Sequence, residues 1–455
     1  MSIMDFSGKH FLVIGAGISG RAASLALAGH GGSVTLNDMK AIDTAEQPWP
    51  DVEAAGVQLV FGSQETNLLD GMDVVVPSPV ISPEIPIMKE AVRRGLPIWS
   101  EVEVACRVTD ADMIGITGTN GKTTTTTLVG EIMKATGRQT VVGGNIGYGL
   151  STQADNLPKE AVVVAELSSF QLEFTHSIKA KAATILNITP DHLDRHHTME
   201  GYAAAKERIF LNQDKGDYAV LNYDDPRVRA MAEDMTGTVV YFSTCGEVPE
   251  GAFYQDGQLI LRLHGQDTVV CAETDLHLFG KHNIQNFLAA ILLTYAAGAP
   301  LDVIRRVLKE FKGVEHRLEK VRTIHGVTYY NDSKGTNVDA SMKALEAFPQ
   351  GHLILIAGGY DKKTPLDDFM ALAAKRVDTL ILIGDAAERF EAAAKKAGIQ
   401  DIRRTGYSME GAIMLASKIA KAPQAVLLSP ACSSFDMYDN FEQRGRVFKG
   451  IVNAI

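Results

Sequence analysis

The segment Gly115–Thr124, which reads GITGTNGKTT, carries the residues best suited to phosphate chemistry. It grows out of an apolar run that predicts a strand and leads into a Thr-rich stretch that predicts a helix. In that order, backbone amides and the helix dipole can hold phosphates, Lys122 can reach the β- and γ-phosphates, and the Thr123 hydroxyl can bind Mg²⁺. Ile116 stands where the strict phosphate-loop pattern has glycine. We predict a nucleoside triphosphate site here, the alternative being a glycine-rich turn without a ligand.

Polar residues follow two later apolar runs. Glu166 ends the run AVVVAE, and Asp191-His192 follows ILNIT. A carboxylate beside a phosphate loop is what Mg²⁺ requires in phosphoryl transfer. Taken singly, Glu166 could cap a helix and His192 could be a turn residue, but the nearby phosphate loop favours a metal site. Lys206, in YAAAKERIF, is by itself an ordinary solvated helix lysine.

A second glycine motif, Gly15–Gly20, reads GAGISG between a predicted strand and a predicted helix. Asp38 ends the next predicted strand, where a carboxylate can face a ribose. The motif alone is compatible with NAD or FAD, with another nucleotide diphosphate, or with tight packing only. Two polar strand ends near the C-terminus, Asn331–Asn337 and Leu428–Ala431, are either turns or ligand loops.

Composition limits the class of protein. The chain has 455 residues, 45% of them hydrophobic, and a net charge of −11. At about 150 residues per domain this predicts three domains, and the acidic balance argues against general nucleic-acid or anionic-membrane binding. The four cysteines have no metal-ligand spacing, the first apolar run is too short for a signal peptide, and the apolar stretch Phe287–Ala299 is too short to span a bilayer. We therefore expect a cytoplasmic protein with reduced cysteines.

Strands alternating with helices predict an α/β fold with parallel sheets in three parts. The predicted domains are 1–100 (Rossmann-like), 101–313 (phosphate-loop ATPase type) and 314–455 (Rossmann-like). Between about residues 250 and 278, short alternating strands predict an antiparallel flap. The predicted strands are Lys9–Gly15, Ser33–Asp38, Asp73–Pro79, Pro97–Ser100, Met113–Thr117, Ala161–Leu167, Ala182–Ile188, Tyr218–Asn222, Val327–Asn331, His352–Ala357, Thr379–Ile383 and Ala425–Ser429. The predicted helices are Ile18–Ala28, Ile85–Arg94, Asn283–Ala297 and Leu301–Phe311.

Motifs along essentially the whole chain together resemble the Mur ligases. Those that carry the resemblance are GITGTNGKTTTT, GGNIG (Gly143–Gly147), ELSSFQLE (Glu166–Glu173), DHLDRH (Asp191–His196), HNIQN (His282–Asn286), HRLE (His316–Glu319), NDSKGTN (Asn331–Asn337) and LSPACSSFDMYDNFEQRGRVF (Leu428–Phe448). The phosphate loop and the DH element are shared across the superfamily, including the folylpolyglutamate synthetases. ELSSFQLE and the last segment are typical of the member that adds D-glutamate.

The resemblance implies an ATP-dependent amide ligase that adds D-glutamate to UDP-N-acetylmuramoyl-L-alanine in peptidoglycan precursor synthesis, through an acyl phosphate, releasing ADP and phosphate. It also implies that the first domain binds the uridine diphosphate of the substrate rather than NAD. No nucleic-acid or membrane partner is implied, and we expect a monomer.

The resemblance assigns roles residue by residue. Lys122, Glu166, His192 and Lys206 would be catalytic. Thr123 and Glu166 would bind one Mg²⁺, and His192 with a carbamylated Lys206 a second. ATP would contact Gly118, Thr119, Asn120, Gly121, Lys122, Thr123, Thr124, Asn283, Arg317 and Asp332. The UDP substrate would contact Ile18, Ser19, Asp38, Asn145 and His192. D-Glutamate would contact Lys334, Thr336, Lys362, Ser434, Phe435 and Phe441, although the two phenylalanines could also be core aromatics.

Three other functions remain open. A related Mur or folate-type ligase would share the ATP site and take a different amine. A nucleotide-switched binding protein would hydrolyse ATP slowly without consuming an amine. An NAD-dependent oxidoreductase built on Gly15–Gly20 would leave the phosphate loop unexplained.

Overall fold

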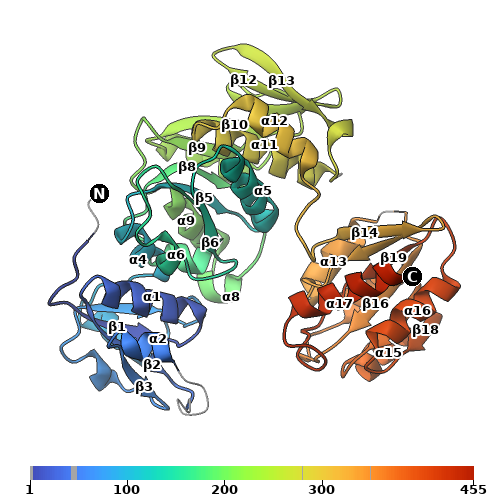
Figure 1. Ribbon diagram of the computed structural model, residues 1–455, viewed down its shortest axis with the longest axis horizontal. Coiled ribbons are helices and arrows are strands. Elements are labelled where there is room, and N and C mark those ends of the chain that lie inside the picture. The colour runs from blue at the N-terminus through green and yellow to red at the C-terminus, as the bar shows by residue number, and fades with distance from the viewer. Residues whose placement is uncertain (1–3, 42–48, 279, 349) are drawn as a thin grey trace. The chain divides into compact units, whose positions relative to one another are not determined.

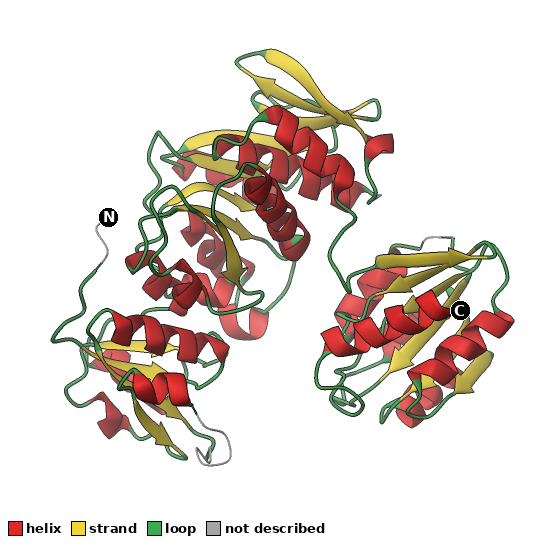
Figure 2. Ribbon diagram, viewed as in Figure 1, coloured by secondary structure: helices red, strands yellow, loops and turns green. Residues whose placement is uncertain are grey.

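The computed structural model describes residues 4–41, 49–278, 280–348 and 350–455. The chain divides into two compact units, Met1–Phe311 and Lys312–Ile455. Unit 1 holds a four-stranded and a nine-stranded sheet, and unit 2 holds a six-stranded sheet. Figure 1 labels the elements along the chain, and Figure 2 shows the strands of each sheet packed against helices. The α/β fold class predicted from the sequence is confirmed.

The four-stranded sheet is parallel, in the order β3-β2-β1-β4. Its strands are β1 (His10–Ile14), β2 (Ser33–Asp38), β3 (Gln58–Phe61) and β4 (Val74–Pro77). Its helices are α1 (Ile18–Gly29), α2 (Pro50–Ala54), the 3-10 turn η1 (Thr66–Leu69) and α3 (Pro86–Arg93). Along β1, Phe11 and Val13 pack in one apolar cluster and Leu12 and Ile14 in another. An uninterrupted apolar strand forms here because both faces of the sheet are covered.

The nine-stranded sheet has the order β13-β12-β11-β10-β9-β8-β5-β7-β6. Its strands are β5 (Asp112–Thr117), β6 (Thr140–Gly144), β7 (Val162–Glu166), β8 (Ala180–Ile185), β9 (Tyr218–Asn222), β10 (Thr238–Ser243), β11 (Gly251–Gln255), β12 (Gln258–Leu263) and β13 (Gln266–Ala272). The surrounding helices are α4 (Glu101–Arg107), α5 (Lys122–Ala135), α6 (Leu150–Ala154), α7 (Ser169–Glu173), α8 (Leu193–His196), α9 (Met199–Glu207), η2 (Arg208–Phe210), α10 (Pro226–Ala230), η3 (Met231–Asp234), η4 (Glu273–Asp275), α11 (Lys281–Ala296) and α12 (Leu301–Glu310).

The predicted flap is part of this large sheet. Strands β11, β12 and β13 pair antiparallel with one another, as expected, but β11 also pairs in parallel with β10. The antiparallel strands therefore extend the nine-stranded sheet rather than form a separate one. The sequence pattern shows alternation within a strand but does not show which neighbour the first strand will join.

The six-stranded sheet of unit 2 has the order β14-β15-β19-β16-β17-β18, with only β14 antiparallel to its neighbour. Alternate residues of β16 pack in two different clusters, Leu355 with Phe369 and Phe390, and Ile356 with Phe448. The strands are β14 (Glu319–Ile324), β15 (Val327–Asn331), β16 (Leu353–Gly358), β17 (Val377–Ile383), β18 (Asp401–Arg404) and β19 (Ala425–Leu428). The helices are α13 (Val338–Glu346), α14 (Asp367–Ala373), α15 (Ala387–Lys396), α16 (Met409–Ile419) and α17 (Phe441–Ala454).

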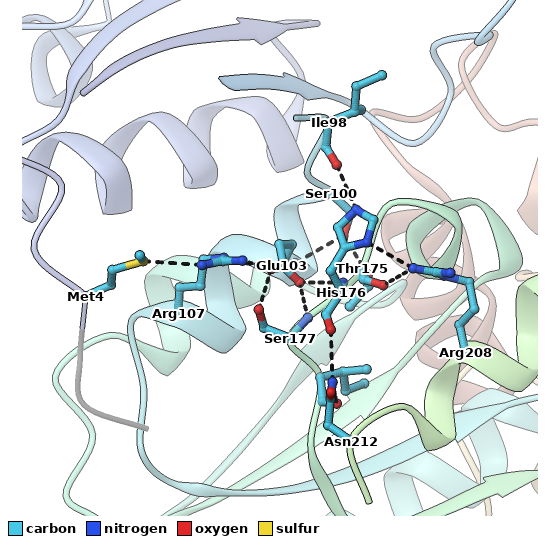
Figure 3. Close-up of polar contacts among 11 residues, drawn as sticks. Met4, Ile98, Ser100, Glu103, Arg107, Thr175, His176, Ser177, Arg208 and Asn212 are labelled. Carbon is cyan, nitrogen blue, oxygen red and sulfur yellow. Dashed lines mark hydrogen bonds and ion pairs between the residues drawn. The ribbon is translucent and has the colours of Figure 1, made fainter. Parts of the chain in front are cut away.

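Polar contacts around the buried Glu103 carboxylate link the segment that follows the four-stranded sheet to the segment that precedes β8 (Figure 3). Glu103 accepts hydrogen bonds from the backbone amides of His176 and Ser177 and pairs with Arg107, each at 2.7 Å. Nε2 of His176 lies 3.1 Å from the carbonyl oxygen of Ile98, which follows the four-stranded sheet. Because donors of Arg107, His176 and Ser177 surround the Glu103 carboxylate, both of its oxygens have hydrogen-bond partners and the ion pair can be buried. The contacts hold the connection between the sheets in place.

The structure differs from the predicted strands in two ways. Predicted strand Pro97–Ser100 is reduced to a single bridge, Val75 to Ile98, because the chain turns into α4 directly afterwards. Five strands were not predicted, namely β3, β6, β10, β14 and β18. The division into domains 1–100, 101–313 and 314–455 stays a prediction. Among the described residues, every helix is too short or too polar to cross a membrane.

Candidate active site

The glycine-rich loop of unit 1 has the geometry of a phosphate cradle. Gly121, with φ of +86°, stands directly before the 14-residue helix α5, which begins at Lys122. A Cβ on Gly121 would lie 2.3 Å from Asn286 Oδ1, so no other residue fits without movement. Gly118 is also left-handed, with φ of +149°. The backbone amides of α5's first turn therefore lie at the end of a glycine-rich loop, where a helix N-terminus can bind an anion.

Two asparagines that the sequence analysis did not assign hold this loop. Asn187 follows β8; its Oδ1 accepts from the amide of Asn120 at 2.9 Å, and its Nδ2 donates to the Asn120 carbonyl at 3.2 Å. Asn286 on α11 is buried and accepts from the Thr125 hydroxyl at 3.3 Å. Asn286 also donates to Asn283, a predicted ATP contact, at 3.5 Å. The loop is thus shaped before any ligand binds.

Lys122 and Lys206 both approach the phosphate loop. Lys122 Nζ donates to the carbonyl oxygens of Gly118 and Thr119, each at 2.9 Å. Lys206, on α9, is 2% exposed and donates to Gly118 O at 3.0 Å and Thr117 Oγ1 at 3.4 Å. Burial, and secondly the charge of Lys122, lower the pKa of Lys206 to about 7. Lys206 is therefore not the solvated helix lysine that its sequence neighbourhood suggests.

Glu166 provides a buried carboxylate with one unmet oxygen. It ends β7, next to β5 in the sheet, and is 2% exposed. Its Oε1 accepts from Asn145 Nδ2 at 2.9 Å, whereas its Oε2 is buried without a hydrogen-bond partner. A buried carboxylate oxygen without a donor is costly unless a cation or ligand satisfies it. The donor set at this strand end therefore fits Mg²⁺, whose preferred ligands are oxygens.

His192 is exposed beside an aromatic cluster. It caps α8 with φ of +51°, and its Nε2 lies 3.6 Å from Asp191 Oδ2. Its ring centre lies 4.8 Å from that of Phe170 and 6.3 Å from that of Tyr202. The Tyr202 hydroxyl in turn lies 3.2 Å from Thr119 Oγ1 of the phosphate loop. His192 is thus connected, through Tyr202, to the loop that carries Lys122.

The first glycine turn is built for close backbone approach. A Cβ on Gly20 would lie 1.8 Å from Gly15 O, and one on Gly15 would lie 2.7 Å from Ser78 Oγ. Asp38 accepts from the amides of Ala16 and Lys40, at 2.8 and 2.9 Å. The Asp38 carboxylate, at the end of β2, therefore also holds the Gly15–Gly20 turn in place. Of the other predicted UDP contacts, Ile18 is exposed, Ser19 half-buried and Asn145 exposed.

In unit 2, the predicted D-glutamate residues other than Phe441 lie on loops that follow the carboxyl ends of β15, β16 and β19. Lys362 Nζ donates to the Thr336 carbonyl at 3.2 Å, joining two of these loops. Ser434 is 2% exposed, and Lys334 is half-buried. Phe435 is 69% exposed, so its interpretation as a core aromatic is wrong. Phe441 begins α17 and is half-buried, with its ring edge toward His316 at 6.2 Å between ring centres.

Arg444 ties these loops together, and the sequence analysis assigned it no role. It is 1% exposed and donates to Ser333 Oγ, Ser333 O, Ser433 O and Cys432 O at 2.9 to 3.2 Å. All these acceptors are neutral, and burial lowers the pKa of Arg444 to about 10. A buried guanidinium therefore adds positive charge beneath loops expected to receive a dicarboxylic amino acid.

The remaining predicted ATP contacts, Arg317 and Asp332, belong to unit 2. Asp332 is buried and accepts from Ser429 Oγ at 2.7 Å and from the Leu318 amide at 3.2 Å. Burial raises the pKa of Asp332 to about 7, while the nearby Arg317 lowers it by a smaller amount. Arg317 itself is exposed.

A cluster of two glutamates and a histidine in unit 2 is not proposed as a metal site. Glu315, His316 and Glu319 place ligand atoms within 4.8 Å of one another. Lys449 Nζ already lies 2.8 Å from Glu315 Oε1 and 2.6 Å from Glu319 Oε1. The Lys449 ammonium already pairs with both carboxylates, so a metal cation would have to displace it.

The site residues missed by sequence analysis had a weak signal. Asn286 and Arg444 lie inside the motifs HNIQN and NFEQRG, and Asn187 follows the apolar run ILNIT. Their partners are far away in sequence, 161 residues in the case of Thr125 and Asn286. A sequence motif can single out such a residue, but it does not show which distant residues the side chain contacts.

A glycine-rich phosphate loop at the end of a parallel strand, with a buried carboxylate on the neighbouring strand, defines a nucleotide-dependent α/β protein. Comparison with known families gives the particular class. Residues 116–294 match the Mur ligase middle domain, and residues 316–432 match the Mur ligase glutamate ligase domain. The chain belongs to the Mur ligase family.

Full-length relatives support this assignment. The chain is 46% identical over 453 residues to a UDP-N-acetylmuramoylalanine–D-glutamate ligase of Desulfitobacterium hafniense (strain Y51), covering 99% of this chain and 98% of that protein. It is 43% identical to the enzyme of that name from Pelotomaculum thermopropionicum, covering 100% and 99%. Among solved structures, a UDP-N-acetylmuramate-alanine ligase from Thermotoga maritima has a TM-score of 0.57 at 19% identity, with 98% and 99% coverage. At that identity the structural likeness shows the fold alone.

Proposed function

We propose that this protein is the ATP-dependent ligase that adds D-glutamate to UDP-N-acetylmuramoyl-L-alanine in peptidoglycan precursor synthesis. The observation that carries the proposal is the near-complete match to D-glutamate ligases, 46% identical over 99% of the chain. The phosphate loop and the buried, half-satisfied Glu166 supply the chemistry that such a ligase needs. An NAD-dependent oxidoreductase would use neither feature.

The reaction proceeds in two balanced steps. The alanyl carboxylate attacks the γ-phosphorus of ATP, the bond to the bridging oxygen breaks, and an acyl phosphate and ADP form. The amine of D-glutamate then attacks the acyl carbon, loses a proton, and expels phosphate as the amide forms. Because water would hydrolyse the acyl phosphate, the site must exclude it during the second step.

For ATP, we assign the amides of Gly118–Thr124 and the Lys122 ammonium to the phosphates. Asn283, Arg317 and Asp332 are assigned to the rest of the nucleotide. Thr123 and Glu166 would hold Mg²⁺, which neutralises phosphate charge and orients the γ-phosphate when bound. The unpartnered Glu166 Oε2 supports this assignment.

For a second Mg²⁺, we propose His192 together with Lys206 carrying a carbamate. An amine that adds CO₂ and loses a proton becomes an anion able to bind a metal. An ammonium there would instead repel Mg²⁺, by about 4 kcal/mol for each pair of unit charges 4 Å apart at an effective dielectric constant of 20. The burial of Lys206 beside Lys122, with neutral hydrogen-bond acceptors only, favours the modification.

For the two organic substrates, we assign Ile18, Ser19 and Asp38 to the uridine diphosphate part. Asn145 and His192 are assigned to the muramoyl-alanine end. D-Glutamate is assigned to unit 2, where Lys334 and Lys362 can each pair with a carboxylate. The other residues assigned to D-glutamate are Thr336, Ser434, Phe435 and Phe441. We also propose that the enzyme is a monomer and that it works in the cytoplasm, the latter supported by four cysteines that are all free of disulfides.

The decisive experiment measures phosphate release from ATP and Mg²⁺ with UDP-N-acetylmuramoyl-L-alanine. D-Glutamate is compared with L-glutamate, L-lysine, meso-diaminopimelate and no amine. Release only with D-glutamate, matched by ADP and peptide product, supports the proposal. Release with a different amine would make the chain another ligase of the family, and release without any amine would favour a nucleotide-switched binding protein.

A further inference from the structure

Arg195, in helix α8, connects two loops that belong to different sheets of unit 1. Its Nη1 donates to the carbonyl oxygens of Pro79 and Ile81, at 3.2 and 2.9 Å. On the opposite side, Nε and Nη2 donate to Glu173 Oε2 at 3.0 and 2.9 Å. The guanidinium carbon lies 4.6 Å from the centre of the Phe170 ring. The side chain is only 10% exposed, so the guanidinium is largely shielded from water.

One side of this connection supports the first glycine turn. Pro79 and Ile81 follow β4 of the four-stranded sheet, and the preceding Ser78 donates from Oγ to Gly15 O at 3.0 Å. The amide of Ile81 donates back to Ser78 O at 2.9 Å. Between the two carbonyls held by Arg195, Val80 is 85% exposed. The loop is thus short, closed on itself and placed against the turn assigned to the uridine diphosphate.

The other side of the connection supports the reaction centre. Glu173 ends α7, the short helix that follows Glu166. Phe170, on the same helix, has its ring centre 4.8 Å from that of His192 and 5.6 Å from that of His196. Arg195 itself stands three residues after His192. Moving the Arg195 side chain would therefore affect the segment that carries His192.

We infer that Arg195 is a positioning residue that sets the UDP-substrate turn in register with the reaction centre. The inference rests on the proposed function. In that reaction, a carboxylate held through the first sheet must meet a γ-phosphate held at the second. A planar guanidinium with donors on several edges can fix both sides at once, which a single ammonium cannot. Misplacing reacting atoms by about 1 Å costs on the order of 100-fold in rate.

Each binding site should survive loss of Arg195, because each is held by other contacts. The glycine turn is fixed by Asp38, through the Ala16 amide at 2.8 Å, and by Ser78. The phosphate loop is fixed by Asn187, through the Asn120 amide at 2.9 Å, and by Asn286. A residue that only positions the two sites should thus change kcat and leave their separate affinities in place.

The test compares Arg195→Ala and Arg195→Lys with the wild type. Arg138→Ala is the matched control, because the Arg138 guanidinium also donates to backbone carbonyls, those of Glu160, Ala161 and Ala297, and to the Asp112 carboxylate. Calorimetry measures the affinity for UDP and for ATP separately, and phosphate release gives kcat and KM. We expect Arg195→Ala to lower kcat about 100-fold with both affinities retained. Arg195→Lys should resemble the alanine variant, and Arg138→Ala should keep the wild-type kcat.

Three results would overturn the inference. An unchanged kcat in Arg195→Ala would show that the register does not depend on this side chain. Parallel loss of UDP or ATP affinity would make Arg195 a structural residue of one site. Full activity of Arg195→Lys would show that a positive charge suffices without the two-sided contact. Absence of D-glutamate-dependent release by the wild type would instead refute the proposed function, and this inference with it.

Discussion

The side-chain amines of Lys122 and Lys206 donate to the same acceptor, the main-chain oxygen of Gly118, at 2.9 and 3.0 Å. The two residues come from different helices, α5 and α9, and meet at the left-handed glycine of the phosphate loop. When both amines are protonated they repel each other, and the charge of Lys122, after burial, lowers the pKa of Lys206 unless an anion lies near both. Phosphate oxygens or a carbamate would supply that negative charge, and both belong to the proposed reaction.

Replacing Lys122 by alanine should abolish turnover while leaving the UDP-substrate site intact. The ammonium is the only side-chain cation assigned to the ATP phosphates, and removal of such a group costs on the order of 10³-fold in rate. The glycine turn Gly15–Gly20 lies on the other sheet of unit 1 and keeps its own contacts. Phosphate release and UDP calorimetry measure the two effects. Lys134→Ala, an exposed position on the same helix, serves as the control, and near-normal ATP consumption by Lys122→Ala would contradict the assignment.

Glu166→Gln should weaken the binding of Mg²⁺ at the phosphate loop and thereby slow turnover. Glutamine can still accept from Asn145 through Oε1, but it places an amide nitrogen where the unpartnered Oε2 lies. We expect kcat/KM to fall by about 100-fold or more, with a higher Mg²⁺ concentration for half-maximal rate. A chelator should stop the wild type reversibly. Glu131→Gln, exposed on α5, should keep the wild-type Mg²⁺ titration, and an identical titration for Glu166→Gln would remove it from the metal site.

Local signals explain which parts of the fold were predicted. The strands β2, β9 and β15 match the predicted bounds, because apolar or β-branched runs end at polar residues there. The strand β14, EKVRTI, and the strand β18, DIRR, lie at sheet edges and carry charged residues. Edge strands are half solvated, so their sequences do not show the apolar run by which a central strand is recognised.

The residues of the candidate site likewise fall into those that local sequence predicts and those that it does not. Gly121 and Lys122 were predicted because their roles depend on backbone shape and on neighbours within a few residues. Arg444 and Arg195 were not, since their acceptors Ser333 and Pro79 lie 111 and 116 residues away. The assigned roles of the predicted site residues stay predictions that the variants above and below address.

Ser434→Ala should raise the KM for D-glutamate with little change in the KM for ATP. Ser434 is 2% exposed on the loop that Arg444 holds in unit 2, where the amino acid is assigned. Loss of a hydroxyl that donates to a carboxylate costs about 1.5–3 kcal/mol, which corresponds to a KM increase of about 10-fold or more. Ser417→Ala is the control, because its hydroxyl donates only locally, to Met414 O at 3.0 Å. An effect confined to ATP would place Ser434 elsewhere.

The contribution of Asp332 to the free energy of unfolding should fall as the pH rises toward neutrality. Burial raises the pKa of this carboxyl from 3.8 to about 7, so between these values the folded chain binds more protons than the unfolded chain. Stability from this group is therefore complete below pH 3.8 and lost as the pH rises to about 7. Asp332→Asn removes the buried charge and can keep the contacts to Ser429 and to the Leu318 amide.

The expected result is a difference between wild type and Asp332→Asn that depends on pH. At about pH 8 the variant should unfold at a higher temperature than the wild type, by an amount corresponding to about 2–4 kcal/mol, whereas at about pH 5 the two should be close. Scanning calorimetry of the full chain at several pH values measures this. Asp439→Asn, at an exposed carboxylate two residues before α17, should show no such trend. A constant difference across the pH range would mean that Asp332 is ionised throughout and stabilised by Arg317 and Arg444, the cations that act on its charge.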